Sequence, residues 1–394
     1  MKNLVVTCVG IVLAVVAASP NCWALVFQFD GGGVPADDFL VADNWDEFGG
    51  GPDAVPGASD LAIINDNFVV TYSGVANTVG ALKVGADWPV TGPLGTPGTL
   101  NITSGHLTVA GGGDAFEIGR ACCAGDGIVN LTGSAVLEIQ GSDPIVGVRE
   151  RAELNIGPNA SVISTRPDGA YWRIGHNGPS IDPFNPVGGL QGNGLLNVEG
   201  SFSAHVIFVG VDDGTGEVRV SGNGSLTLTD NLVPGVNTHF PNRSALIHMI
   251  GSNATLTAFN LESANGLAEN HNKYVFDADP VGGVSPITLV PKLDVNNMLV
   301  GGAVNITNND LVVNLNGLAW NIGDSLLLFD AAPGQIYGEF ASSAVFGSEV
   351  LHRVDYDNVT GDIRVALGVP EPSTMLLLGL GMSLAICAKR RASR

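Results

Sequence analysis

Basic residues are scarce in this chain. It has 17 Lys and Arg against 38 Asp and Glu in 394 residues, for a formal net charge of −21 at pH 7. Because contacts to phosphate need Lys and Arg, this composition argues against nucleic acid as a partner. Cations, basic surfaces and neutral or cation-bridged glycans are the partners left open. The simpler explanation, which we favour, is that acidity keeps an exported β-protein soluble.

Cysteine is also scarce, with five residues in the chain. Cys8, Cys22 and Cys387 lie in the two apolar terminal segments, which leaves the adjacent Cys122 and Cys123. Their Cα atoms are about 3.8 Å apart across a trans peptide, so a disulfide between them would be strained. Free thiols or oxidised partners elsewhere are the alternatives. The chain thus has no disulfide framework, and no Cys and His residues stand at zinc-binding spacing.

Sustained helical periodicity is missing outside the two terminal segments. Charged residues make up only 14% of the chain, whereas glycine contributes 54 residues, about twice its usual share. Val, Ile, Leu, Thr and Asn fill short alternating segments between Gly-rich turns. This composition predicts an all-β exported protein with many tight turns.

The first 24 residues have the order of a secretory signal peptide. Lys2 supplies the positive start, Leu4 to Ala18 form the apolar stretch, and Cys22-Trp23-Ala24 places small residues at both cleavage-specificity positions. This pattern predicts cleavage after Ala24, with Leu25 as the first mature residue. An uncleaved N-terminal membrane anchor is the alternative.

The last 26 residues carry three features in order. The motif Pro370-Glu371-Pro372 comes first, and its prolines keep the chain extended. The uncharged apolar segment Met375 to Ala388 follows, and Lys389, Arg390 and Arg391 end it. Counted from Ser373, the apolar part is about 16 residues long, slightly below the roughly 17–25 that span a bilayer. The basic residues would hold its end on the cytoplasmic side.

This tail closely resembles the PEP-CTERM sorting signal of Gram-negative bacteria. The resemblance implies that a membrane-embedded exosortase recognises Pro370, Glu371 and Pro372, removes the helix and basic tail, and passes the protein outward. It also implies a transient transmembrane anchor, followed by a cell-surface or extracellular location. A plain single-pass anchor is the alternative.

A recurring phrase runs through the middle of the chain: a small residue, a short apolar-x-apolar strand, a turn and a second apolar strand. Equivalent first strands begin near positions 99, 128, 153, 195, 217 and 245. Several copies end in a third strand with an apolar-Gly pair, at 117–119, 145–147, 173–175 and 208–210. Repeats of roughly 20–50 residues indicate solenoids. Three strands per repeat predict the coil of a parallel β-helix, with a β-propeller or a chain of small sandwiches as alternatives.

The repeats resemble the Gly-rich β-solenoid repeats of bacterial surface proteins, including autotransporter passenger stalks. Asn101, Asn130, Asn155 and Asn197 occupy matching positions in four of them. We predict that these residues form an internal or corner ladder whose amides satisfy backbone groups from coil to coil. An Asn-lined ligand surface is the alternative.

These patterns divide the chain into five regions. They are a signal peptide (1–24), an N-terminal β cap (25–95), solenoid repeats (96–273), a C-terminal β-module (274–368) and the sorting signal with its transmembrane helix (369–394). Trp45 is expected to cover the open end of the first coil, with carbohydrate stacking as the sharper alternative. The long repeat between 153 and 195 predicts a protruding loop at 179–186.

Motifs of known catalytic sites are absent: there is no nucleophile elbow, phosphate loop, dinucleotide fingerprint or metalloprotease motif. Because β-helices that cleave polysaccharides use carboxylates with a basic residue on one sheet, the nearest candidates are Asp212, Asp213, Glu217 and Arg219. The same acidic turn could hold Ca²⁺, although it lacks the spacing of known calcium repeats, and ordinary turn chemistry explains it as well. The sequence therefore predicts no enzyme, no metal site and no obligatory cofactor.

Taken together, the residues and the tail predict a non-catalytic envelope or extracellular-matrix protein that an exosortase sorts. The resemblance of the tail implies a structural role in exopolysaccharide or biofilm matrix. A glycan-binding adhesin, with Trp45, Trp172 or Tyr171 as stacking platforms, is the second hypothesis. A polysaccharide lyase or hydrolase built on the β-helix is the third.

Overall fold

The computed structural model describes residues 25–85, 96–120, 125–148, 150–166, 169–176, 192–212, 214–236, 245–262, 272–294, 297–347 and 351–367. Within these residues the regular structure is β-strand, apart from one 3₁₀ turn, η1 (Ala42–Asn44). They include no helix with the length and apolar character needed to cross a membrane. The predicted signal peptide and the predicted transmembrane segment at 375–388 lie outside the described residues.

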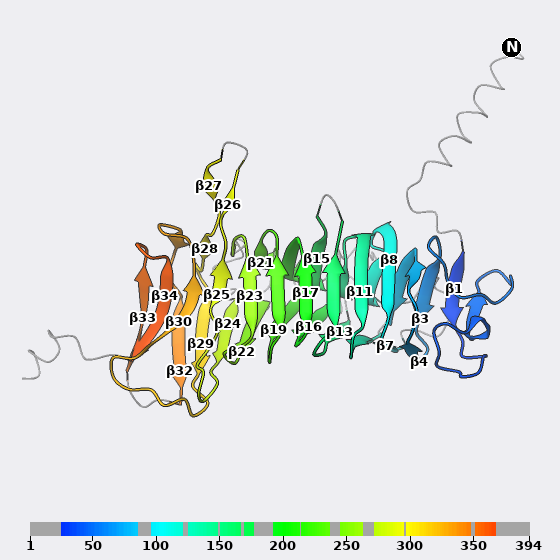
Figure 1. Cartoon of the computed structure of the whole chain (residues 1–394), viewed down its shortest axis with the longest axis horizontal. Coiled ribbons are helices and arrows are strands. Elements are labelled where there is room, and N and C mark those ends of the chain that lie inside the picture. Colours follow the sequence, from blue (N-terminus) through cyan, green and yellow to red (C-terminus); the bar gives the residue numbers. More distant parts are fainter. Residues whose placement is uncertain are drawn as a thin grey trace, which may run out of the picture.

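Most strands belong to three long sheets, A, B and C, which together form the rod in Figure 1. Sheet A consists, in spatial order, of β2 (Trp45–Glu47), β1 (Val26–Phe29), β3 (Leu61–Ile64), β6 (Ala81–Val84), β9 (Phe116–Arg120), β12 (Ile145–Val148), β15 (Tyr171–His176), β18 (Val206–Val211) and β21 (Leu232–Val236). Sheet B consists of β4 (Val69–Tyr72), β7 (Gly98–Ile102), β10 (Gly127–Leu131), β13 (Arg151–Ile156), β16 (Asn193–Val198), β19 (Thr215–Val220), β22 (Ala245–Ile250), β24 (Lys273–Asp277), β29 (Asp310–Asn314) and β32 (Ser342–Phe346). Sheet C consists of β5 (Asn77–Val79), β8 (His106–Gly113), β11 (Val136–Ser142), β14 (Ser161–Ser164), β17 (Ser201–Ala204), β20 (Ser225–Leu228), β23 (Thr255–Ala258), β25 (Ile287–Leu289), β30 (Ser325–Asp330), β34 (Asp362–Leu367) and β33 (His352–Asp357).

Each coil contributes one strand to sheet B, then one to sheet C, then one to sheet A. Thus β7, β8 and β9 make one coil, and β10, β11 and β12 make the next. Neighbouring coils pair in parallel and in register: Asn130 lies opposite Asn101 on one side and Asn155 on the other, and Asn155 lies opposite Asn197. The described strands therefore form the parallel β-solenoid that the repeat predicts.

The parallel ladders extend on both sides of the 96–273 repeat region. Towards the N-terminus, β1 pairs with β3, β3 with β6 and β6 with β9. Towards the C-terminus, β24 and β29 continue sheet B. Antiparallel pairing closes the ends, where β2 joins β1 and where β34 joins β30 and β33. The outer strands β4 and β29 keep the alternation of buried and outward residues, which is what fills a core.

Glycine marks the edge where sheet A meets sheet B. Gly119, Gly147, Gly175 and Gly210 have φ angles between +63° and +84°, the left-handed region. A side chain on Gly175 would put its Cβ 1.9 Å from the carbonyl oxygen of Thr215, at the start of β19. At Gly119, Gly147 and Gly175 conformation and space both require glycine, whereas at Gly210, where the nearest atom lies 3.3 Å from an added Cβ, conformation is the main requirement.

Inward side chains form one continuous core. In β10, Val129 and Leu131 are fully buried, whereas the alternate residues Ile128 and Asn130 face outward. Each fully buried Val or Leu contributes about 1.5–3 kcal/mol by removal from water. Since successive coils repeat this alternation in register, the core runs from coil to coil along the rod.

Aromatic clusters close both ends of this core. Trp45 packs edge-on against Phe29 and Phe39 at ring-centroid distances of 5.1 and 4.8 Å. Its indole N–H donates to the carbonyl oxygen of Phe39 at 2.7 Å, and the side chain is fully buried. At the other end, Phe329 packs against Tyr274 and Phe276. Trp45 therefore fills the end of the core, and its carbohydrate-stacking alternative is wrong because the ring is inaccessible.

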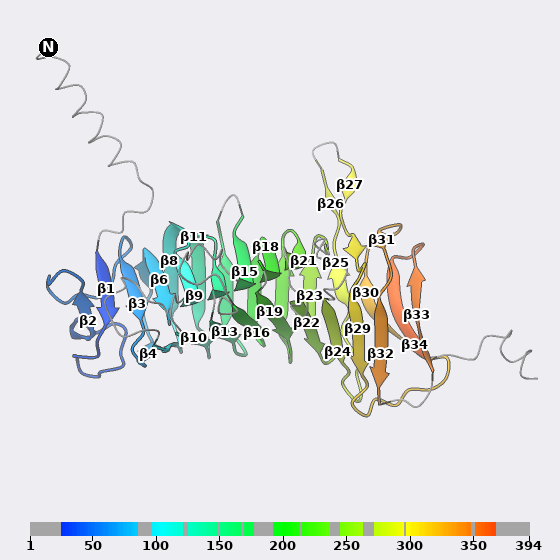
Figure 2. The same ribbon diagram turned by 180° about the vertical axis from the view of Figure 1, so that it is seen from behind.

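One hairpin leaves the wall of the rod, as Figures 1 and 2 show. Its strands β26 (Lys292–Leu293) and β27 (Leu299–Val300) pair antiparallel. At its base, the Lys292 ammonium lies 4.4 Å from the centroid of the Phe259 ring. Two short strands, β28 (Val304–Asn305) and β31 (Ile336–Tyr337), then pair in parallel. The predicted protruding loop at 179–186 lies outside the described residues.

Candidate functional site

Several predicted site residues lie outside the part of the chain that the structure describes. They are the cleavage residue Ala24, the sorting motif Pro370, Glu371 and Pro372, and the basic residues Lys389, Arg390 and Arg391. Cys122, Cys123 and Asp213 also lie outside it.

The predicted aromatic platforms on β15 point to opposite sides of the sheet, because neighbouring residues of a strand alternate. Trp172 is fully buried in the core, with its ring 4.8 Å from that of Phe202 and 6.0 Å from that of Phe116. Its predicted role as a glycan platform is therefore wrong. Tyr171 is 40% exposed and stacks on Phe208 at 6.0 Å. Of the three proposed platforms, Tyr171 alone faces solvent.

The predicted acidic cluster is divided between two sheets. Asp212 follows β18 of sheet A, where its Oδ2 lies 3.1 Å from Nε2 of His176 on the neighbouring coil. Burial, reinforced by the charge of Arg173, lowers the pKa of His176 despite that carboxylate. Glu217 and Arg219 instead lie on β19, on the outward face of sheet B. The Asp212 carboxylate and the Glu217–Arg219 pair thus belong to separate surfaces.

A polar cleft lies on the outward face of sheet B. Glu153, Leu195 and Glu217 occupy one register position on β13, β16 and β19, and Leu246 follows on β22. The cleft has a volume of about 310 Å³. Its polar lining comes from Arg151, Glu153, Asn193, Thr215 and Glu217, and its apolar lining includes Leu195 and Leu246.

Each carboxylate of the cleft is neutralised by an arginine two residues away on its own strand. The guanidinium of Arg219 donates to Oε1 of Glu217 through Nη2 at 2.7 Å and Nε at 3.1 Å. Arg151 donates to Oε1 of Glu153 through Nη2. Residues i and i+2 of a strand share a face, which is why these pairs form. The cleft therefore offers both hydrogen-bond donors and acceptors without a large net charge.

His248 on β22 lies beside the cleft between two carboxylates. Its Nε2 is 2.9 Å from Oδ2 of Asp277, and its Nδ1 is 3.7 Å from Oε1 of Glu217, an ion-pair distance longer than a normal hydrogen bond. Burial opposes the charged imidazole, but the two carboxylates outweigh it and raise the pKa of His248. In return, His248 lowers the pKa of Glu217 against the effect of burial, and Arg219 adds to this. The cluster is most stable with His248 protonated and Glu217 ionised.

Replacing His248 by Gln is expected to change how stability depends on pH. The His248 contribution is fully present below the ordinary pKa of 6.5 and is lost as pH rises through the raised folded-state pKa. The Glu217 contribution is present above 4.5 and is lost as pH falls through the lowered folded-state pKa. The stability difference between the native chain and His248→Gln should thus be largest near pH 5.5 and shrink towards pH 8.

Urea denaturation across this pH range measures the difference. His352→Gln is the matched control, because His352 is half-buried and its Nε2 lies 3.2 Å from the Ser343 hydroxyl, a neutral partner in place of the two carboxylates. A His248→Gln difference that stays constant from pH 5.5 to pH 8 would contradict the electrostatic account.

The asparagine ladder lies on the same outward face, next to the cleft. Nδ2 of Asn130 donates to Oδ1 of Asn101 at 2.9 Å, and Nδ2 of Asn155 donates to Oδ1 of Asn130 at 3.0 Å. The predicted ladder of Asn side chains from coil to coil is confirmed for these three residues, but its predicted internal or corner position and its predicted bonding to backbone groups are wrong. These residues alternate with core residues along their strands, so they face outward, and their amides bond to one another. Beyond Asn197 the same row continues with Arg219 and His248.

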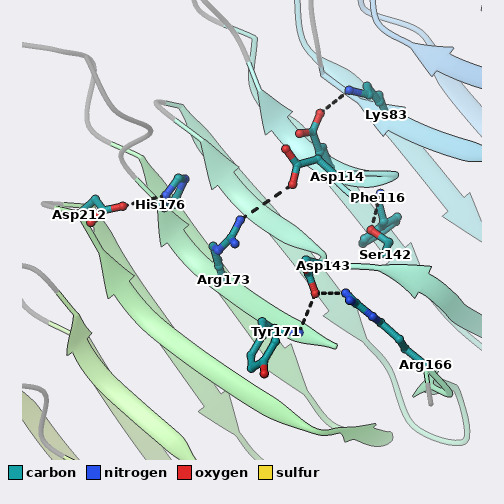
Figure 3. A network of polar contacts seen from close by, with 11 residues as sticks. Lys83, Asp114, Phe116, Ser142, Asp143, Arg166, Tyr171, Arg173, His176 and Asp212 are labelled. Carbon is teal, nitrogen blue, oxygen red and sulfur yellow. Dashed lines mark hydrogen bonds and ion pairs between the residues drawn. The ribbon is translucent and has the colours of Figure 1, made fainter. Parts of the chain in front are cut away.

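A second set of polar contacts, shown in Figure 3, ties coils together on the sheet A side. Nζ of Lys83 on β6 lies 2.7 Å from Oε2 of Glu117 on β9, and both side chains are buried. A carboxylate oxygen of Asp143 accepts the backbone N–H of Tyr171 at 3.1 Å and also contacts Arg166. Because the partners belong to different coils, these contacts hold the stack together.

No group of three or more His, Cys, Asp or Glu side chains in the described part of the chain is arranged to hold a metal ion. The acidic turn considered for Ca²⁺ includes Asp213, which lies outside that part.

The tail matches a known family model. Residues 368–391 match the PEP-CTERM protein-sorting motif, which confirms the motif predicted at Pro370, Glu371 and Pro372. No curated protein and no solved structure matches the chain significantly. The motif is the recognition signal for an exosortase, so it implies an exported protein of a Gram-negative bacterium that is transiently anchored in the membrane.

Proposed function

We propose that this protein is a non-catalytic structural component of the cell envelope or extracellular matrix, delivered by exosortase-dependent sorting. The observation that carries the proposal is a sorting motif at 368–391 that follows a long, continuously paired solenoid. Each coil adds about 4.8 Å to the rod, so the number of coils sets its length. The matrix of exopolysaccharide or biofilm is the setting in which such a rod serves as a stalk or spacer.

The contacts between coils support a mechanical role. Backbone ladders join every neighbouring pair of coils in sheets B and C over the repeat region. Side chains add to them through the Asn101–Asn130–Asn155 ladder and the buried Lys83–Glu117 pair. In solenoids each repeat is stabilised by its neighbours, so such contacts resist separation of the stack.

The sorting step is tested on protein recovered from the surface of the native host. Mass spectrometry is expected to find no peptide from residues 375–394, because exosortase cleavage removes them. Glu371→Ala should retain the tail and accumulate in the membrane, whereas Ser393→Ala, outside the matched residues, should be processed normally. Surface protein that still carries residues 375–394 would overturn the sorting proposal.

The structural role is tested separately by deleting the gene and measuring matrix cohesion. We expect a weaker matrix that the native chain restores. An unchanged matrix would contradict the structural role, and release of new sugar ends by the purified protein would contradict the non-catalytic one.

A further inference from the structure

The sheet B cleft has the size of a small-molecule site. Its volume of about 310 Å³ lies at the lower end of the roughly 300–1,000 Å³ typical of ligand pockets. We infer that this cleft binds a neutral saccharide unit, and that sheet B is the face through which the rod holds polysaccharide. The inference deepens the proposed matrix role and rests on it for its setting.

The lining matches the two-sided chemistry of a sugar ring. Leu195 lies between Glu153 and Glu217 in the register of sheet B, and it gives an apolar floor for the C–H face of a ring. The carboxylates stand on strands two spacings apart, about 10 Å between backbones, which leaves room for a ring between them. Asn193 and Thr215 add polar groups at the rim.

Charge selects a neutral ligand. Glu153 and Glu217 are each compensated by an arginine, so the cleft has little excess charge to attract an amine. The net charge of −21 on the whole chain repels a polyanionic chain such as a polyuronate. Guanidinium N–H groups beside carboxylate oxygens provide donors and acceptors together, which suits the adjacent hydroxyl groups of a saccharide.

The carboxylates are held in place before any ligand arrives. Glu217 is bound by Arg219 and faces His248, which in turn is fixed by Asp277. Asn314, from β29, donates to the same Asp277 carboxylate. On the opposite side of the cleft, Nδ2 of Asn155 donates to Oε2 of Glu153 at 3.3 Å. Fixed side chains lose little conformational entropy on binding, which favours recognition by a few hydrogen bonds.

The strongest alternative is that these ion pairs are only structural. The chain itself supplies the comparison: Arg353 and Asp355 form the same i, i+2 pair on β33, with Nε 2.8 Å from Oδ1. That pair is not part of the cleft lining. A purely structural role would make the two pairs equivalent in every binding measurement.

The test uses the full chain in a detergent without a sugar headgroup, titrated calorimetrically with neutral disaccharides and neutral oligosaccharides. A uronic-acid oligosaccharide serves as the anionic probe. Glu153→Gln and Glu217→Gln are each expected to weaken binding of a neutral saccharide about 10-fold or more, because hydrogen bonds to charged groups are lost. Asp355→Asn is the matched control and should bind as the native chain does. Asn193→Ala, at an exposed rim position with a small effect on folding, should also weaken binding.

The outcomes distinguish a saccharide-binding cleft from a purely structural set of ion pairs. Absence of binding to every neutral saccharide up to about 10 mM, equal binding by the cleft variants and Asp355→Asn, or a preference for the uronic-acid probe would overturn the inference. New sugar ends in the same samples would leave the site standing but overturn the non-catalytic function. A retained tail in the cell, together with intact saccharide binding, would overturn the sorting proposal alone.

Discussion

Replacing Lys83 by Met is expected to lower the free energy of unfolding by about 3–5 kcal/mol. The Lys83 ammonium lies 2.7 Å from Oε2 of Glu117, and the two side chains are 10% and 0% exposed. The substitution removes this positive charge from a carboxylate that water cannot reach. A buried charge that loses a compensating partner is destabilising, because little solvation replaces the lost attraction.

A double-mutant cycle separates the pair from its surroundings. Adding Glu117→Leu to Lys83→Met should recover much of the loss, since an apolar pair can replace a buried ion pair at little cost. Lys273→Met, at an exposed position on β24, is the control and should change stability by no more than about 0.5 kcal/mol. The account fails if urea denaturation finds the Lys83 and Lys273 variants equally stable.

Gly175→Ala is expected to destabilise the rod by about 3 kcal/mol or more, from backbone strain and overpacking together. Gly175 has a φ of +71°, and a Cβ there would lie 1.9 Å from the carbonyl oxygen of Thr215. The methyl group can be accommodated only if sheet A moves away from sheet B. Because the contact is to backbone, no side-chain rotation relieves it.

Gly222 provides a matched control for this substitution. It also has a positive φ, +61°, but no atom lies within 4 Å of a Cβ built on it. Gly222→Ala should therefore cost only the backbone strain, about 1–2 kcal/mol. Thermal and urea unfolding compare the two, and hydrogen exchange should locate the weakened coils around β15 and β19. Equal losses in the two variants would show that packing at the sheet edge is not what requires glycine.

Much of the structure of each coil could be predicted from the local pattern of residues in the sequence. The matching Asn residues at 101, 130, 155 and 197 indicated which positions of successive coils are equivalent, and the register of sheet B places them opposite one another. The alternation along β15 also contained the signal that was missed at Trp172, since Trp172 shares a face with the buried Ile174. Local periodicity is reliable here because a solenoid repeats one backbone path, so similar sequence segments occupy equivalent positions in successive coils.

The cleft could not be read in the same way. Glu153 and Glu217 are 64 residues apart, and only stacking of the intervening coil brings them to one face. In the sequence, each glutamate directly follows the small residue that begins a repeat, Ala152 or Gly216. This shared position indicates that the two lie near each other only once the register of the strands is known. Asp212 and Glu217 show the converse: they are five positions apart, yet the chain passes from one sheet to another between them.

The sequence by itself determined the sorting signal of this protein and the solenoid architecture of its rod. A sorting motif is read by another protein as a linear segment, and a core needs only apolar residues at regular intervals. The tertiary structure alone decided which polar side chains meet. Lys83 joins Glu117, His248 joins Asp277, and Leu195 separates two carboxylates, because their distances depend on how coils stack.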